Sequence, residues 1–152
     1  MYNGILHLHS GLRWVLLLLL ILAIYRSSTA KGKAFSATDN KVGLVLMIVA
    51  DIMLLVGLYQ WFAGDWGLTS IQKNGMKEVM GNATLRFYAI EHTIGMLVAI
   101  IMIHIGRAYS KKNIPDPIKH KRIVLFFGLA LLIVLVSIPW PFRMIGTGRG
   151  WF

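Results

Sequence analysis

Ionisable side chains inside the apolar stretches of this chain are the residues best placed to do chemistry. His9 and Arg13 lie one helical turn apart in the first stretch, and Glu91 and His92 are adjacent in the third. Placing an ionisable group in hydrocarbon costs on the order of 3 kcal/mol on insertion scales. Each of these four residues is therefore expected to have a partner or a function.

The two histidines are expected to face each other at a similar depth. At 1.5 Å per residue, His9 lies about 8 Å below Gly4, and His92 lies about 12 Å below Thr84. The first and third helices enter from the same side, and the difference in depth is within ordinary helix tilt. Two neutral imidazoles facing each other across a helical bundle are the arrangement that axial ligation of a b-type haem requires. The sequence therefore predicts one haem b between these helices, with His9 and His92 as ligands of the haem iron.

Other residues are predicted to complete this haem site. Arg13 is expected to pair with a haem propionate or with Glu91, and Gly95 is expected to leave space for the flat macrocycle. His7 is the alternative ligand, and His9 is favoured slightly because it shares a helix face with Arg13. The chain has no cysteine, which excludes covalent c-type attachment and thiolate metal sites.

The same histidine pair has two other interpretations. Histidines also hydrogen-bond across transmembrane helices without any cofactor, as a structural or proton-handling cluster. A metal site is the third interpretation, although no third carboxylate or histidine ligand is evident beyond Glu91. The sequence leaves these alternatives open.

Three more ionisable residues need an explanation. Asp51 falls near the middle of the second stretch, where we expect a hydrogen bond to a neighbouring helix, a pairing with Arg13, or a proton site coupled to quinone chemistry. His104 follows His92 by 12 residues, which rotates it by about 120°. It is expected to be a hydrogen-bonded structural group, with a second-cofactor or quinone-side role as the alternative. His120, between two lysines, is expected to be solvated.

The elements that must position these residues are transmembrane helices. With 57% apolar and 14% charged residues and a mean hydropathy of +0.66, the chain cannot cover a soluble domain with polar surface. Four apolar runs, residues 4–25, 42–64, 84–109 and 123–142, are each long enough to cross about 30 Å of hydrocarbon. We predict an all-α, antiparallel four-helix bundle in a lipid bilayer, forming one domain over residues 1–152. A short amphipathic helix is expected within residues 65–83.

The charge distribution predicts the orientation of this bundle. The net charge of +10 arises from 16 Lys and Arg against 6 Asp and Glu. Ten of the 16 fall in residues 26–41 and 107–122, between apolar runs, as is typical of cytoplasmic loops. Both termini are therefore expected on the non-cytoplasmic side, and nucleic acid is not expected as a partner.

Several motifs resemble those of a known family. The chain resembles the small four-span bacterial membrane proteins commonly labelled cytochrome B, on motifs spread over nearly its whole length: Leu6-His-Leu-His-Ser-Gly-Leu-Arg-Trp14, Arg86-Phe-Tyr-Ala-Ile-Glu-His92, Gly106-Arg107, Lys119-His-Lys121 and Ile138-Pro-Trp-Pro-Phe-Arg143. That family tends to place a histidine in the middle of the second span, where this chain has Asp51. Haem ligation through the second helix is therefore not expected.

The resemblance and the histidine pair together imply a function. They indicate an electron-transfer protein of a bacterial inner membrane that relays electrons between quinol and a redox partner. Such a chain is expected to act within a larger membrane complex or a homo-oligomer, and not as a stand-alone enzyme. The competing interpretation is a cofactor-free accessory or assembly subunit of a larger respiratory or transport complex.

Overall fold

The computed structural model of the chain describes residues 2–30 and 32–143. Its helices are α1 (Tyr2–Ser28), α2 (Ala37–Ala63), α3 (Leu68–Gly81), the one-turn α4 (Ala83–Arg86), the π-helical segment η1 (Phe87–Glu91), α5 (His92–Lys111) and α6 (Asp116–Ser137). No strand occurs within the described residues, so the all-α prediction is confirmed.

Four helical segments are long and apolar enough to cross a membrane: Gly4–Ser28, Ala37–Ala63, Ala83–Lys111 and Asp116–Ser137. The first three match the predicted spans closely, whereas the fourth is displaced toward the N-terminus from the predicted residues 123–142. It begins with Pro117 in its first turn and ends before Pro139. Proline is tolerated in the first turn of a helix but cannot continue one, and the residue before a proline avoids helical dihedral angles.

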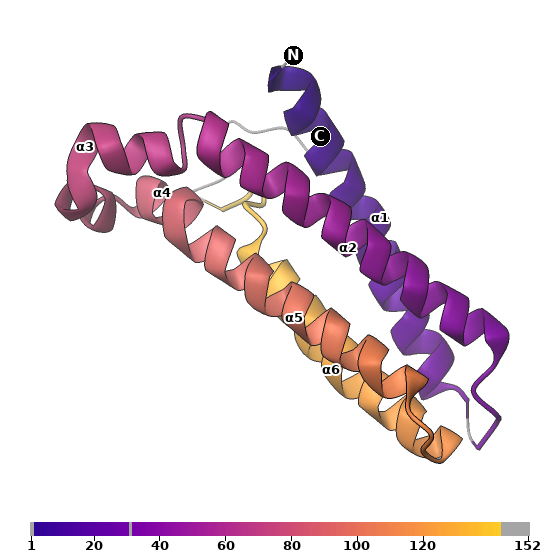
Figure 1. Ribbon diagram of the computed structural model, residues 1–152. Helices are drawn as coiled ribbons and strands as arrows, with labels where there is room; N and C mark the ends of the chain where they lie inside the picture. The colour runs from indigo at the N-terminus through magenta and orange to yellow at the C-terminus, as the bar shows by residue number, and fades with distance from the viewer. Residues whose placement is uncertain (1, 31, 144–152) are drawn as a thin grey trace.

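The four spans form an antiparallel bundle, with the chain running down α1, up α2, down α5 and up α6 (Figure 1). Contacts between helices follow the ring α1–α2–α5–α6 and close back on α1. Many large apolar side chains point outward; the aliphatic ones that are more than 60% accessible on these helices are Leu18, Leu55, Leu132 and Val136. An outer surface this apolar suits lipid and not water. The chain is a multi-pass membrane protein.

The interior is closely packed in the half of the bundle nearest the α1–α2 turn. Fully buried side chains from all four helices meet there, including Leu20, Leu46, Ile103 and Phe127. The backbone of α5 approaches α6 closely at Gly106, where an added Cβ would lie 2.6 Å from Cε1 of Phe127. The other half, toward α3, is hollow and is described below.

Polar contacts join the helices at the packed end. Ser36 caps α2 by accepting a hydrogen bond from the backbone N–H of Asp39, whose carboxylate accepts from the backbone N–H of Ser36 in return. The same carboxylate accepts a 2.7 Å hydrogen bond from Nε of Arg26 on α1. On α5, Arg107 donates to the side-chain oxygen of Asn40 at 2.6 Å. This end therefore holds α1, α2 and α5 in register.

The expectation that His120 is solvated is wrong. Its side chain is only 5% exposed, its Nδ1 lies 3.3 Å from the hydroxyl of Ser27, and its ring centre lies 5.1 Å from that of Phe35. The reason is the early start of α6: residues 119–121 are helical, so the two lysines and the histidine between them point in different directions. His120 is the member of that triplet that faces the bundle.

The predicted helix within residues 65–83 is present as α3, at the hollow end of the bundle (Figure 1). It is kinked at Gly75, whose φ of 79° is a left-handed value that glycine adopts without a steric penalty. Val79 is fully buried, whereas Met76 and Met80 are about half exposed. The helix therefore has one face on the bundle and another that is open.

The close approach at Gly106 predicts a stability difference between two glycines. Gly106→Ala should destabilise the protein by about 1–3 kcal/mol, because the new methyl group overlaps the Phe127 ring. Gly128→Ala is the matched control, since a Cβ at Gly128 meets nothing within 4 Å. Thermal unfolding in detergent, followed by circular dichroism, measures both. Equal melting temperatures for the two variants would contradict the described packing of α5 on α6.

Candidate functional site

His9 of α1 and His92 of α5 face each other inside the hollow half. Their ring centres are 6.3 Å apart and their planes are inclined by 70°. His7, the alternative ligand, is exposed. The structure therefore brings together the two histidines that the depth argument paired, and it places His9 and not His7 opposite His92.

The hydrogen bond of His92 defines which ring nitrogen is available. Nδ1 of His92 lies 2.7 Å from the backbone carbonyl oxygen of Ser137, the last residue of α6. A carbonyl oxygen only accepts, so Nδ1 carries the proton and donates. In a neutral imidazole this leaves Nε2 with its lone pair, and the same arrangement orients histidine ligands in many metal sites.

A π-helical turn sets the position of His92. The backbone N–H of His92 donates to the carbonyl of Phe87, five residues earlier, and not to the residue four earlier as in an α-helix. The indole N–H of Trp61 on α2 donates to the carbonyl of Ala89 within this turn, at 2.9 Å. Single π-helical turns inside α-helices occur frequently at functional sites. The wider turn changes the helical register immediately before His92.

The surroundings of His9 include a close helix contact and an unsatisfied atom. A Cβ built on Gly57 of α2 would lie 3.5 Å from Cε1 of His9, so a larger side chain at this position would press on the ring. Nδ1 of His9 is buried and has no hydrogen-bond partner among the described residues. A buried polar atom left in this state costs about 1–3 kcal/mol unless something satisfies it.

The two histidines line a cavity of about 190 Å³. A cavity that holds a single water molecule needs about 10–15 Å³, so this cavity is far larger than a gap left by imperfect packing. All four spans contribute to the walls, with Arg13 from α1, Trp61 from α2, Met96 from α5 and Ile138 from α6 among the lining residues. The cavity is mainly apolar, with a few polar side chains such as Ser10, Arg13 and Thr93 in its wall.

Three other predicted site residues lie as follows. Arg13 lines the cavity, with its guanidinium carbon 5.3 Å from the centre of the Trp14 ring. Glu91 is exposed and forms its ion pair with Arg86, at 2.6 Å. Gly95 does not line the cavity; a Cβ there would collide with the hydroxyl of Ser137, so Gly95 lies where α5 approaches α6. Of the three, only Arg13 lies beside the histidine pair.

The spacing of the histidines fits a metal ion between two imidazoles. A ligating nitrogen lies about 2 Å from the metal and the centre of its ring lies roughly 1 Å beyond, so two rings on opposite sides of one metal have centres about 6 Å apart. The observed 6.3 Å is close to this value, and it is also the distance of an edge-to-face contact between two rings.

The described residues contain no group of three or more His, Asp or Glu side chains gathered as if to hold a metal ion. Haem iron needs only two axial ligands from the protein, because the macrocycle supplies the other four. Two histidines on facing helices are therefore a sufficient ligand set for haem.

Asp51 and His104 form a second polar contact, on the outside of the bundle. Nε2 of His104 lies 2.7 Å from Oδ1 of Asp51, and the two side chains are 45% and 43% exposed. The expectation of a hydrogen bond from Asp51 to a neighbouring helix is confirmed, with His104 and not Arg13 as the partner. His104 and His92 point to different neighbours, as the 12-residue spacing predicts.

Sequence reasoning missed three contributors to the site. The carbonyl of Ser137 leaves no mark in the sequence as a hydrogen-bond acceptor, although the prolines that follow indicate that the helix ends there. The π-helical turn has no signal that we recognise. Gly57 does have a sequence signal, because a glycine inside an otherwise bulky apolar run often marks a close approach of another group.

Comparison of the chain with protein-family models, curated proteins and solved structures gave no match. The cytochrome B resemblance therefore stays a prediction. What can be said of function rests on the geometry of the histidine pair, its cavity and the Asp51–His104 contact.

Proposed function

We propose that this protein is a membrane electron-transfer protein that holds one haem b between α1 and α5, with His9 and His92 as axial ligands. The observation that carries the proposal is the histidine pair itself: two imidazoles 6.3 Å apart, on facing helices, inside one cavity. Haem would supply a reversible one-electron change at its iron.

The chain's own residues prepare the site in three ways. The Ser137 carbonyl fixes the tautomer and orientation of His92, and a hydrogen-bonded Nδ1–H raises the basicity of the opposite nitrogen. Arg13 brings a positive charge to the cavity, suited to a carboxylate such as a propionate. Apolar side chains from the four helices keep bulk water away, which is one of the main influences on a haem potential.

The proposed setting is a bacterial inner membrane, with both termini on the non-cytoplasmic side. The cavity then lies in the outer half of the bilayer, because the hollow end of the bundle is the end of the N-terminus. Electrons would pass between quinol in the bilayer and a redox partner. The chain is proposed to act within a larger complex or homo-oligomer.

Haem spectroscopy of histidine variants tests the ligand assignment. Protein expressed with added haem precursor and purified in detergent should show a reduced-minus-oxidised b-type band, with one haem per chain. His9→Ala and His92→Ala should each abolish the band, because each removes an axial ligand. His7→Ala, a change of the same kind two residues away, should retain it because His7 is exposed.

Two outcomes would overturn this assignment in different ways. A band that survives His9→Ala but not His7→Ala would make His7 the ligand. The absence of any band from native protein, folded by circular dichroism and supplied with haem, would remove the electron-transfer proposal. The cofactor-free accessory subunit would then be the better interpretation.

The charge of Arg13 predicts a change in reduction potential. A positive charge close to the haem favours the reduced form, so Arg13→Gln should lower the midpoint potential by about 50 mV or more at this low-dielectric site. Lys73→Gln is the control, since Lys73 forms an exposed pair with Asp65 outside the bundle core. Redox titration of the haem band measures both. An unchanged or raised potential in Arg13→Gln would place Arg13 away from the haem.

The proposed orientation can be tested with single cysteines, because the native chain has none. In intact cells, a membrane-impermeant maleimide should label Lys73→Cys on α3 and should leave Lys33→Cys, in the α1–α2 turn, unlabelled. After the membrane is permeabilised, both should react. The reverse pattern would invert the topology and place the cavity in the cytoplasmic half of the bilayer.

A further inference from the structure

The contact between Asp51 and His104 is unusual because it is exposed on the outer surface of two membrane-spanning helices. Asp51 lies 14 residues after the first residue of α2 and 12 before the last, and at 1.5 Å per residue that is roughly 18–21 Å from either end. Both side chains are nearly half exposed. Ionisable side chains at this depth normally face the interior of a bundle or a water-filled cavity, so one turned toward the bilayer is a functional-site hypothesis by default.

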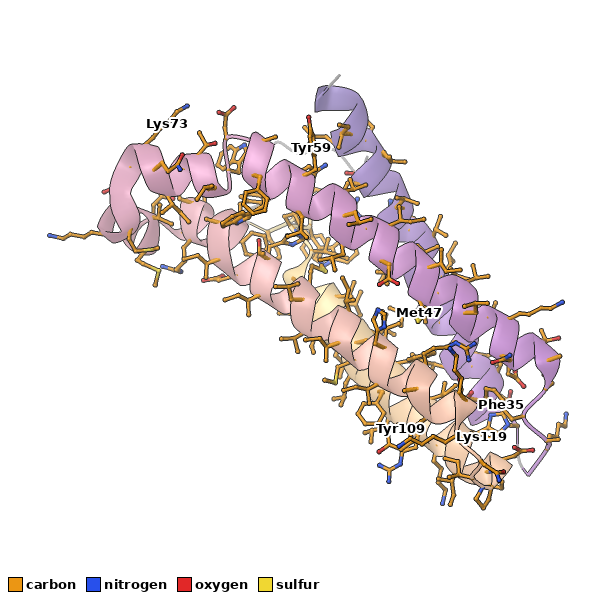
Figure 2. The ribbon with its side chains drawn as sticks, in the orientation of Figure 1. Phe35, Met47, Tyr59, Lys73, Tyr109 and Lys119 are labelled. Atoms are coloured by element: carbon orange, nitrogen blue, oxygen red, sulfur yellow. The ribbon has the colours of Figure 1, made fainter. Side chains whose placement is uncertain are left out.

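The surroundings of the pair are apolar. Ile48, Ile52 and Leu55 of α2 and Ile101 of α5 are each more than 40% exposed and flank it on the outer surface. Figure 2 shows this side of the molecule, with Met47, one helical turn before Asp51, between α2 and α5. The pair is therefore an isolated hydrogen-bonding group on a surface that otherwise suits hydrocarbon.

The pair has hydrogen-bonding capacity to spare. Its single hydrogen bond joins Nε2 of His104 to Oδ1 of Asp51, and neither side chain makes another within the described part of the chain. Oδ2 of the carboxylate can accept. With the proton on Nε2 shared with Asp51, Nδ1 of the neutral imidazole accepts, and it donates once the pair carries a second proton. A ligand that approaches from the bilayer would meet both atoms.

The pair does not line the cavity that holds the histidines, but its neighbours in sequence do. Ala50 and Ile103, which immediately precede Asp51 and His104 in sequence, line its inner end, and Leu97, which is 38% exposed, lines it closer to the surface. The cavity thus extends along α2 and α5 to the level of the pair. Along α5, the pair lies 12 residues from His92, or about 18 Å.

The chemistry of the pair restricts what can bind there. The ligand must dissolve in hydrocarbon, must be thin enough to lie between α2 and α5, and must carry a hydroxyl or carbonyl oxygen at its edge. Phospholipid headgroups stay at the interface and do not reach this depth. A quinone or quinol ring on an apolar tail meets all three conditions.

We propose that Asp51 and His104 bind the oxygen-bearing edge of a membrane-soluble quinone or quinol that enters between α2 and α5. This inference rests on the proposed function in one respect, that electrons from a bound quinol would pass to the haem. Binding of the quinone itself does not need haem. The quinol hydroxyl would donate to Oδ2 of the Asp51 carboxylate. The quinone carbonyl would accept from Nδ1–H of His104 when the pair carries a second proton, because the proton on Nε2 is already shared with Asp51.

Binding of decylubiquinone carrying ¹³C-labelled carbonyls tests the proposal. The full chain in lipid nanodiscs should bind it saturably, with about one molecule per chain, and infrared difference spectra should show a shift of the labelled carbonyl stretch to lower frequency on hydrogen bonding. Asp51→Leu and His104→Leu should each weaken binding at least tenfold and remove the shift. Asp65→Leu, an equivalent change at an exposed aspartate outside the α2–α5 opening, should alter neither.

Other results would overturn the proposal. One is the absence of saturable binding to native protein, and another is equal binding by Asp51→Leu, His104→Leu and Asp65→Leu. A third is conversion of a dimer to a monomer by Asp51→Leu without any quinone binding. The last would make the pair a contact between two copies of the chain. Asp51→Asn retains hydrogen bonding without charge, so it should bind the quinone with intermediate affinity. This variant keeps the test valid if Asp51→Leu misfolds.

The haem and quinone proposals fail separately. A haem band with no saturable quinone binding would remove only the present inference. Quinone binding that persists in His9→Ala, where the haem band is expected to be lost, would show that the Asp51–His104 site is independent of the haem ligands.

Discussion

A polar group inside the bilayer must find its partner within the protein, and this constraint determines how the four helices are arranged. The Ser137 carbonyl accepts from His92, the Ala89 carbonyl accepts from Trp61, and Asp51 pairs with His104. Each contact joins two different helices. Because lipid tails are as apolar as leucine, burial of apolar surface gives little reason for helices to choose particular neighbours in a membrane. Polar contacts and close-packed small residues must supply that choice instead.

The contact at Ser137 shows how a local feature of one helix determines the chemistry of another. The prolines after Ile138 end α6, and the last carbonyls of a helix lack partners within it. One of these carbonyls lies at the depth of His92 and accepts from Nδ1, which leaves the lone pair of Nε2 available. The π-helical turn before His92 also affects the position of this side chain, because it changes the helical register at the start of α5.

The sequence predicted the fold well and the site in part, for reasons that differ between residues. Span lengths follow from hydropathy, and the common depth of His9 and His92 follows from a fixed rise per residue. The rotation of each helix about its axis does not follow, because a uniformly apolar helix has no polar face to reveal it. The burial of His120 was missed because α6 begins earlier than hydropathy indicated, and the pairing of Glu91 with Arg86 was missed because the π-helical turn between them changes the helical register. The π-helical turn escaped prediction because its energetic difference from an α-helical turn depends on tertiary contacts such as the one from Trp61.

The hollow half of the bundle is itself an argument for a ligand. Glycine in the middle of a helix costs roughly 0.5–1 kcal/mol relative to alanine, yet α2 has Gly57 beside the His9 ring. Ala50 and Ala99 line the inner end of the same cavity, whereas the opposite half of the bundle is filled by leucine, isoleucine and phenylalanine. Dispersion contacts are lost wherever an interior is left unfilled, so larger side chains would stabilise a bundle that had only to fold. Gly57 lies beside the His9 ring and the two alanines lie deeper in the same cavity, so each keeps side-chain volume out of a space that a flat cofactor could occupy.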